Sequence, residues 1–189
     1  MGSEQEIFIA RILIVDDQEA NVLLLGEILR DAGYVSITST MDSDMVCELH
    51  LKNRYDLILL DLQMPCMDGF QVMEGLKEIE TNDYLPVLVI TAQPGHKLRA
   101  LAAGAKDFIS KPFDQSEVLV RVKNMLEVRL LHNELQHYND ALEQRVREKT
   151  SDLQESYRKL QHLALHRDNV REEERGGSRA SFMTRWGRR

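Results

Sequence analysis

The sequence predicts a doubly wound α/β fold, in which a five-stranded parallel sheet carries helices on both faces, followed by one long C-terminal helix. Two observations predict this fold. Between residues 11 and 126, short apolar runs alternate with amphipathic segments, as they do where helices connect parallel strands. After Phe113 no Pro or Gly occurs until Gly176, and the apolar residues of this stretch fall into heptads.

The apolar runs are predicted to be strands buried on both faces of the sheet, because they are short and rich in Val, Ile and Leu. They lie at residues 12–15, 35–39, 56–60, 86–90 and 106–109. The segments at residues 19–32, 42–52, 69–79 and 95–104 predict helices, with Gly33 and Gly104 as stop signals. Right-handed crossovers then give a flavodoxin-like strand order, whose functional site lies beyond the carboxyl ends of the strands.

The composition excludes several classes of protein. The net charge of −7 argues against a nucleic-acid-binding surface. No apolar run reaches the roughly 18 residues that a membrane span needs, and the N-terminal extension at residues 1–10 lacks the features of a signal peptide. The two cysteines, Cys47 and Cys66, are too few for a disulfide framework or a zinc site. We therefore expect free thiols and a cytoplasmic location.

Residues 127–171 are predicted to form a coiled-coil helix. One set of heptads has apolar residues at Val128, Leu131, Leu135, Tyr138 and Leu142, and a second set has them at Val146, Leu153, Leu160 and Leu163. The step from Leu142 to Val146 is a four-residue insertion, which locally unwinds a supercoil. A solvated single helix is the alternative, but it would leave the Leu-rich stripe in water. We therefore expect a homodimer through residues 128–163.

Three acidic residues stand at the carboxyl ends of predicted strands. Asp16 and Asp17 follow the first apolar run, and Asp61 follows the third. The first and third strands are neighbours in this strand order, so the three carboxylates are expected to converge. Buried carboxylates repel one another, and a hard divalent cation such as Mg²⁺ offsets that repulsion. Helix capping could explain Asp17 alone, but not all three acids.

Two further residues lie at the same edge of the predicted sheet. Thr91 ends the fourth apolar run, and Lys111 follows the fifth. Taken singly, a Thr at a strand end is usually a turn residue, and a Lys is usually a surface residue. Together with carboxylates and a metal ion, however, a hydroxyl and an ammonium group form a constellation suited to holding a phosphoryl group.

The motifs at these positions resemble the receiver domain of two-component response regulators. They are VDD (15–17), LLDLQMPCMDG (59–69), VLVITAQ (87–93) and KDFISKPF (106–113), and the resemblance covers residues 11–126. It implies that Asp61 is the phosphoacceptor, which attacks the phosphohistidine of a sensor histidine kinase or phosphotransfer protein. A receiver assists its own phosphotransfer and dephosphorylation, but the chain has no kinase catalytic domain.

The resemblance also implies a role for each remaining position. Asp17 would bind Mg²⁺ directly, Asp16 would bind it through water, and the backbone carbonyl of Gln63 would be another ligand. Lys111 would pair with phosphoryl oxygens, and its bond to Pro112 resembles the cis peptide of the family. Thr91 would move to hydrogen-bond the phosphoryl group, and Phe108 occupies the aromatic switch position. A plain core role for Phe108 remains the alternative.

Residues 172–189 are predicted to be a basic, disordered tail. Residues 176–189 can also be back-translated into the coding sequences that the genetic code permits. Read in the frame that starts two bases later, some of these coding sequences encode a string that resembles the phosphorylated-histidine box of a histidine kinase subfamily. One hypothesis is therefore a truncated or frameshifted receiver–histidine kinase hybrid, and a non-homologous tail is the alternative. Coding DNA that cannot be shifted into that string would contradict the hypothesis.

Three classes of function compete. The first is a phosphoaccepting signalling switch with a dimerising helix. The second is an aspartyl phosphatase or phosphotransferase, but those enzymes usually place a second acid two residues after the nucleophile, where this chain has Gln63. The third is a degenerate receiver that acts as a phosphorylation-independent dimerisation adaptor. The intact Asp61, Thr91 and Lys111 favour the first.

Overall fold

A computed structural model of the chain describes residues 4–65, 67–80, 84–93 and 95–183. Within these residues, five parallel strands form one sheet with the order β2-β1-β3-β4-β5. The strands are β1 (Ile12–Val15), β2 (Ile37–Thr40), β3 (Leu57–Asp61), β4 (Val87–Thr91) and β5 (Asp107–Ser110). This confirms the predicted doubly wound fold with the flavodoxin-like strand order.

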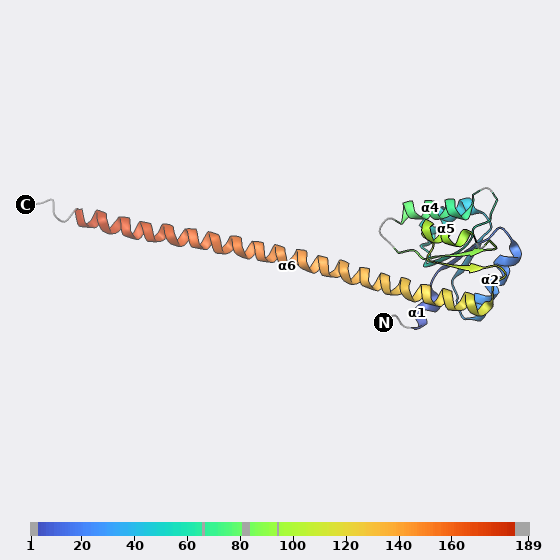
Figure 1. Cartoon of the computed structure of the whole chain (residues 1–189). Coiled ribbons are helices and arrows are strands. Elements are labelled where there is room, and N and C mark those ends of the chain that lie inside the picture. Colours follow the sequence, from blue (N-terminus) through green and yellow to red (C-terminus); the bar gives the residue numbers. More distant parts are fainter. Residues whose placement is uncertain (1–3, 66, 81–83, 94, 184–189) are drawn as a thin grey trace, which may run out of the picture. The chain divides into compact units, whose positions relative to one another are not determined.

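Helices cover both faces of the sheet. They are α1 (Glu4–Ile9), α2 (Glu19–Asp31), the short 3₁₀ helix η1 (Ser43–Met45), α3 (Val46–Asn53), α4 (Gly69–Ile79), α5 (His96–Ala103) and α6 (Gln115–Met183). Figure 1 shows α4 and α5 over one face of the sheet, and α2 with the first turns of α6 over the other.

Alternate residues of the central strands belong to two separate cores, because successive side chains of a strand point to opposite faces. Ile12 and Ile14 of β1 pack with buried side chains of α2 and α6. Leu13 and Val15 pack with side chains of α3, α4 and α5. All four residues are buried, which explains why this strand reads as a continuous apolar run.

Local signals set the ends of several helices. At the start of α4, the Asp68 carboxylate accepts a hydrogen bond from the backbone N–H of Gln71 at 2.9 Å, and the Gln71 side chain accepts one from the N–H of Asp68 at 3.0 Å. This reciprocal capping box satisfies two N–H groups that the helix itself leaves unpaired. After α2, Gly33 has a φ of 99°, as predicted for a glycine that stops a helix.

The N-terminal extension contains a feature that the sequence pattern did not predict. Residues 4–9 form α1, and Ile7 and Ala10 are buried in the same core as α2. The ring of Phe8 lies 5.5 Å from that of Tyr34, which follows α2. A helix of less than two turns is too short to show a helical repeat of apolar residues in the sequence. Only the burial of its side chains in the structure shows that it belongs to the core.

Two compact units make up the chain, residues 1–136 and residues 137–189, and α6 contributes to both. Within the first unit, α6 remains anchored beyond its first turns. The Arg129 side chain, which is buried, donates a hydrogen bond to the backbone oxygen of Tyr84 at 2.6 Å, and Leu130 packs against the core. The first unit therefore includes the beginning of the predicted coiled-coil segment.

Within the second unit, large apolar side chains of α6 are exposed along the predicted heptads. They include Tyr138, Leu142, Val146, Leu153 and Leu160. A Leu-rich stripe that repeats at heptad positions is typical of a helix that packs against another helix. No helix in the described part of the chain is long and apolar enough to cross a membrane.

The end of α6 differs from the sequence prediction. A disordered tail was predicted from residue 172, whereas the helix continues through Gly176 and Gly177 to Met183. Glycine in a helix costs about 1 kcal/mol relative to alanine, which weakens a helix without forbidding it. Residues 184–189 of the predicted tail lie outside the described residues. The histidine-box hypothesis for residues 176–189 concerns the coding DNA and stays a prediction.

Candidate functional site

Three carboxylates meet at the carboxyl ends of β1 and β3. The strands are paired so that Val15 lies beside Leu60, which places Asp16 and Asp61 next to each other. One carboxylate oxygen each from Asp16, Asp17 and Asp61 lies within 4.8 Å of the others. The structure thus brings together the three acids that the sequence placed at this edge.

Lys111 bridges two of these acids. Its Nζ atom lies 2.8 Å from Oδ2 of Asp16 and 2.7 Å from Oδ2 of Asp61. Both carboxylates are buried, so their charges need a partner, and the ammonium group supplies one. Lys111 follows β5, which lies two strands away from β3, so the sheet topology brings this cation to the acids.

Burial and the hydrogen bonds of Lys111 shift the pKa values of Asp61 and Lys111. Burial raises the pKa of Asp61 above its ordinary value, and the hydrogen bond from Lys111 only partly opposes this shift. For Lys111, burial acts to lower the pKa, but hydrogen bonds to Asp16 and Asp61 outweigh it and raise the pKa. A protonated Lys111 is therefore a stable part of the site, whereas the negative charge on Asp61 is disfavoured by its surroundings.

Asp17 differs from the other two acids in accepting no hydrogen bond from the residues that the structure describes. Its Oδ1 atom is buried without a hydrogen-bond partner among the described residues. The residue at the cap of α2 is Gln18, and no side chain caps that helix, so capping does not account for Asp17. A buried, unsatisfied carboxylate oxygen beside two more carboxylates fits the oxygen ligands that a hard divalent cation prefers.

Thr91 and Gln63 lie at the same edge of the sheet. Thr91 is the buried last residue of β4, and its Oγ1 atom accepts a hydrogen bond from the backbone N–H of Gln93 at 3.1 Å. Its backbone oxygen accepts one from the N–H of Lys111 at 2.9 Å. The backbone N–H of Gln63 donates to Oδ1 of Asp61 at 3.2 Å. Each of these residues thus stands where the sequence placed it, beside the acids or on an adjoining strand end.

The remaining predicted positions lie on and after β5. The peptide bond between Lys111 and Pro112 is cis, as the resemblance implies. Phe108 pairs with Val89 of β4, and its half-buried ring packs against the core on the α4 and α5 face. The guanidinium carbon of Arg121 lies 6.0 Å from the centre of this ring.

One residue of the site was not predicted from the sequence. The side-chain amide of Asn21 donates to both carboxylate oxygens of Asp16, at 2.9 and 3.1 Å, and the backbone N–H of Gln18 donates to Oδ1 at 3.0 Å. These donors fix the Asp16 carboxylate in one orientation. An Asn in the first turns of a helix is common, so no motif could have distinguished Asn21.

Gly69 allows the loop after β3 to lie close to Asp61. A Cβ atom at Gly69 would lie 2.6 Å from the backbone oxygen of Asp61 and 2.9 Å from Cα of Leu62. We expect Gly69→Ala to lower the free energy of unfolding by about 1–3 kcal/mol, because backbone atoms cannot move aside cheaply. Urea unfolding measures this loss.

Gly26→Ala is the matched control for that substitution. A Cβ atom at Gly26 would meet only the guanidinium group of Arg30, with Nη1 nearest at 3.0 Å, and that flexible side chain can move. Its effect is expected to lie between neutral and a gain of about 1 kcal/mol, since alanine is the better helix former. Equal losses in the two variants would contradict the backbone clash at Gly69.

Comparison with known proteins identifies the family of this domain. The family model for the response regulator receiver domain matches residues 12–123. The chain belongs to the response regulator receiver family. The predicted resemblance is thereby confirmed, and residues 12–123 form a response regulator receiver domain.

Among curated relatives, the response regulator PleD of Caulobacter vibrioides is 41% identical over 128 residues, which are 67% of this chain and 28% of PleD. Hybrid signal transduction histidine kinase B of Dictyostelium discoideum is 32% identical over 127 residues, which cover 60% of this chain and 6% of that kinase. The chain thus spans less than a third of the length of these two relatives. The shared part is the receiver, not the whole protein.

Solved structures show the same fold. The chemotaxis response regulator CheY4 of Vibrio cholerae superposes with a TM-score of 0.57 at 28% identity, over 62% of this chain and 98% of CheY4. NtrX from Brucella abortus superposes with a TM-score of 0.62 at 27% identity, over 69% of this chain and 29% of NtrX.

Proposed function

We propose that this receiver takes a phosphoryl group onto Asp61 from a phosphohistidine of a sensor histidine kinase or phosphotransfer protein. In this reaction the Asp61 carboxylate attacks phosphorus, the bond between phosphorus and the histidine nitrogen breaks, and the imidazole leaves. The product is a mixed anhydride, which is an activated acyl phosphate. Its lability makes the modification suited to a reversible signal.

The observation that carries this proposal is the arrangement of charge around Asp61. Lys111 holds one oxygen of the Asp61 carboxylate at 2.7 Å and also contacts Asp16 at 2.8 Å, so a cation is already positioned where phosphoryl oxygens would arrive. Fixed charges aimed at developing negative charge lower the barrier of phosphoryl transfer. Lys111 is therefore proposed to pair with the incoming phosphoryl group.

The acids around Asp61 are proposed to hold Mg²⁺, the cation that receiver domains bind at an Asp cluster. Asp17 would be a direct ligand, Asp16 would bind through water, and Asp61 and the backbone carbonyl of Gln63 would complete the protein ligands. When bound, the ion supplies positive charge that offsets the negative charge of the phosphoryl oxygens. The buried, unsatisfied oxygen of Asp17 supports this assignment.

Thr91 and Phe108 are proposed to convert phosphorylation into a conformational signal. The Thr91 hydroxyl now accepts a hydrogen bond from the N–H of Gln93, and it would turn to donate one to a phosphoryl oxygen. That movement would free space beside β4 and β5, into which the half-buried Phe108 ring would rotate. A local change in hydrogen bonding then biases the surface formed by these strands and their helices.

The output of the switch is proposed to pass through α6, acting as a dimerising helix in the cytoplasm. The exposed heptad stripe of the second unit supports pairing with a second copy of the chain. The curated relatives differ in kind, from a hybrid histidine kinase to the DNA-binding regulator RpaA of Synechocystis. The receiver domain alone therefore does not indicate which output the protein has. No nucleic-acid or membrane partner is proposed.

Incubation of the full chain with acetyl phosphate tests this proposal. We expect a labile gain of one phosphoryl group per chain in the presence of Mg²⁺, and a much smaller gain with EDTA. Intact-protein mass spectrometry measures the gain, and light scattering on the same sample measures the oligomeric state. No gain under conditions that label a control receiver would leave the chain as a phosphorylation-independent dimerisation adaptor.

A further inference from the structure

A cavity lies at the end of the sheet opposite the acidic site. It has a volume of about 550 Å³, and its lining comes from α4, the start of β4, the end of α5, Lys106 before β5 and His132 of α6. Val87, the first residue of β4, belongs to this lining, whereas Asp61 ends the neighbouring parallel strand. We call it the basal cavity. Its volume falls in the range of pockets that hold small organic ligands.

The floor and wall of the basal cavity suit a flat, apolar group. Met73, Leu76 and Val87 form part of its floor, and each is buried. The rings of Tyr84 and His132 lie 5.5 Å apart with their planes tilted by 47°, and together they form an aromatic wall. Aromatic rings pack favourably against such surfaces through offset or edge-to-face contacts.

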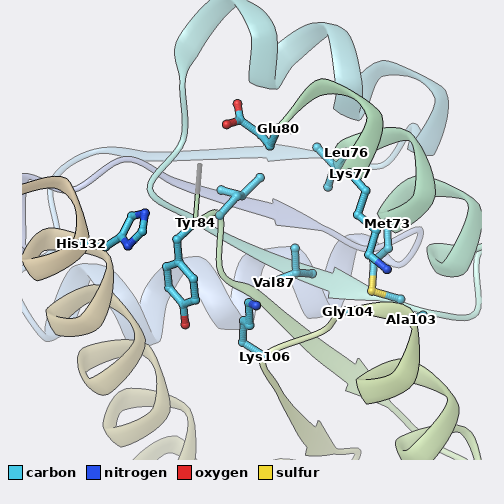
Figure 2. A pocket seen from close by; sticks show the side chains of 11 residues that line it. Met73, Leu76, Lys77, Glu80, Tyr84, Val87, Ala103, Gly104, Lys106 and His132 are labelled. Atoms are coloured by element: carbon cyan, nitrogen blue, oxygen red, sulfur yellow. The ribbon is translucent and has the colours of Figure 1, made fainter. Parts of the chain in front are cut away.

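Two lysines give the cavity a positive rim. Lys106 Nζ lies 4.8 Å from the centre of the Tyr84 ring. The Lys77 ammonium lies over Gly104, where a Cβ atom added to the glycine would meet Nζ at 3.0 Å. Figure 2 shows the Lys106 side chain beside the Tyr84 ring, and the Lys77 side chain on the opposite side of the view. Within the described residues neither lysine has a carboxylate partner.

The carboxylate that lines the cavity is already engaged by other groups. Oε1 of Glu80 lies 2.8 Å from Nη1 of Arg54 and 2.9 Å from Nε2 of His50. The side chain of Glu80 is 8% exposed, so it is turned toward these partners rather than toward solvent. Arg54 offsets the charge of Glu80, so within the described part of the chain no free carboxylate compensates the two lysine charges around the apolar floor.

We propose that the basal cavity binds a small planar organic anion, with its ring on the apolar floor beside Tyr84 and its anionic group between Lys77 and Lys106. The anionic group is of the carboxylate, sulfonate or phosphate type. This binding does not require phosphorylation of Asp61, because the cavity lies at the end of the sheet opposite the acidic site. Its lining includes residues of both α4 and α6, so a bound anion would bridge those two helices.

Titration of the full chain with 1-anilinonaphthalene-8-sulfonate, an aromatic sulfonate, tests the proposal by fluorescence. We expect saturable binding at one site per chain. Replacing both lysines with Met, in Lys77→Met/Lys106→Met, keeps side chains of similar length and is expected to weaken binding at least about tenfold, since two charge-assisted contacts are lost. Lys52→Met, at an exposed position of α3, is the matched control and should bind as the wild type does.

A neutral probe separates charge from apolar contact. N-phenyl-1-naphthylamine has the same rings without the sulfonate, and it should bind the double variant and the wild type equally. Unchanged affinity of the sulfonate for the double variant, or no binding to the wild type, would overturn the proposal.

Filling the cavity gives a second, independent test. Ala103→Trp places an indole in the basal cavity and is expected to remove binding of both probes, while cooperative thermal unfolding reports that the variant is folded. A folded Ala103→Trp variant that binds both probes as the wild type does would place them elsewhere, for instance on the exposed apolar stripe of α6, and would overturn the assignment.

Discussion

Asp61→Asn is expected to abolish the gain of a phosphoryl group from acetyl phosphate, with a loss in rate of at least about a thousandfold. An amide nitrogen or oxygen cannot form the acyl phosphate that a carboxylate forms. The fold should survive, because burial raises the pKa of Asp61 and thereby disfavours its charged form, and the substitution removes that charge. Asparagine also keeps an oxygen that can accept the hydrogen bond from Lys111.

Asp56→Asn is the matched control, because it makes the same substitution five positions earlier, just before β3 begins. The Asp56 carboxylate accepts a hydrogen bond from the backbone N–H of Arg11 at 2.9 Å, and the asparagine oxygen can accept the same bond. This variant is expected to gain the phosphoryl group as the wild type does. Circular dichroism of both variants measures their folding.

A labile phosphoryl gain that persists in Asp61→Asn would place the phosphoacceptor elsewhere and contradict the proposed role. A gain that is stable to acid would instead indicate a phosphoester on a Ser, Thr or Tyr hydroxyl, because acyl phosphates hydrolyse readily in acid. Loss of the gain in both Asp variants would attribute the effect to folding rather than to the nucleophile.

The residues of the acidic site were predictable because their positions follow from strand ends. Asp16, Asp61 and Lys111 are separated in the sequence, but each comes at the carboxyl end of a short apolar run, and parallel strands place those ends at one edge. Asn21 was not predictable, since its role depends on the distance from its amide to Asp16 and not on a motif. The same holds for the basal cavity, whose lining is dispersed from Met73 to His132.

The strands that are buried on both faces of the sheet were predictable from the sequence, whereas the elements with exposed residues or few residues were less so. The run at residues 12–15 gives the bounds of β1 correctly, because the strand is central and buried on both faces. The edge strand β2 begins at Ile37 rather than at residue 35 and contains the exposed Thr38 and Ser39, which give a weak apolar signal. The burial of α1 arises from tertiary contacts such as that of Phe8 with Tyr34.

Introducing charge into the apolar stripe of α6 is expected to abolish the proposed dimer. The side chains of Leu142 and Leu153 are exposed in the single chain, at 48% and 71%, so they are free to pack against a second helix. Burial of a Leu side chain contributes about 1.5–3 kcal/mol, and the double variant Leu142→Lys/Leu153→Lys removes four such side chains from a dimer. The dissociation constant should therefore rise at least about a thousandfold.

The double variant Gln144→Lys/Gln154→Lys separates the loss of apolar packing from the gain of charge. It adds the same charge at neighbouring exposed positions that lie off the heptad stripe. Lysine and glutamine are both good helix formers, so the helix itself should persist in either variant. Sedimentation equilibrium should show a monomer for the Leu variant and a dimer for the Gln variant.

Equal dissociation of the two variants would mean that α6 associates through charge or not at all, and a monomeric wild type would favour the solvated single helix. The dissociation constant of each variant is then measured before and after phosphorylation, to test whether the signal passes through the apolar stripe of α6. If phosphorylation changes the dissociation constant of the Gln variant alone, the receiver signals through the apolar stripe, because the two variants share the same receiver and differ only on α6.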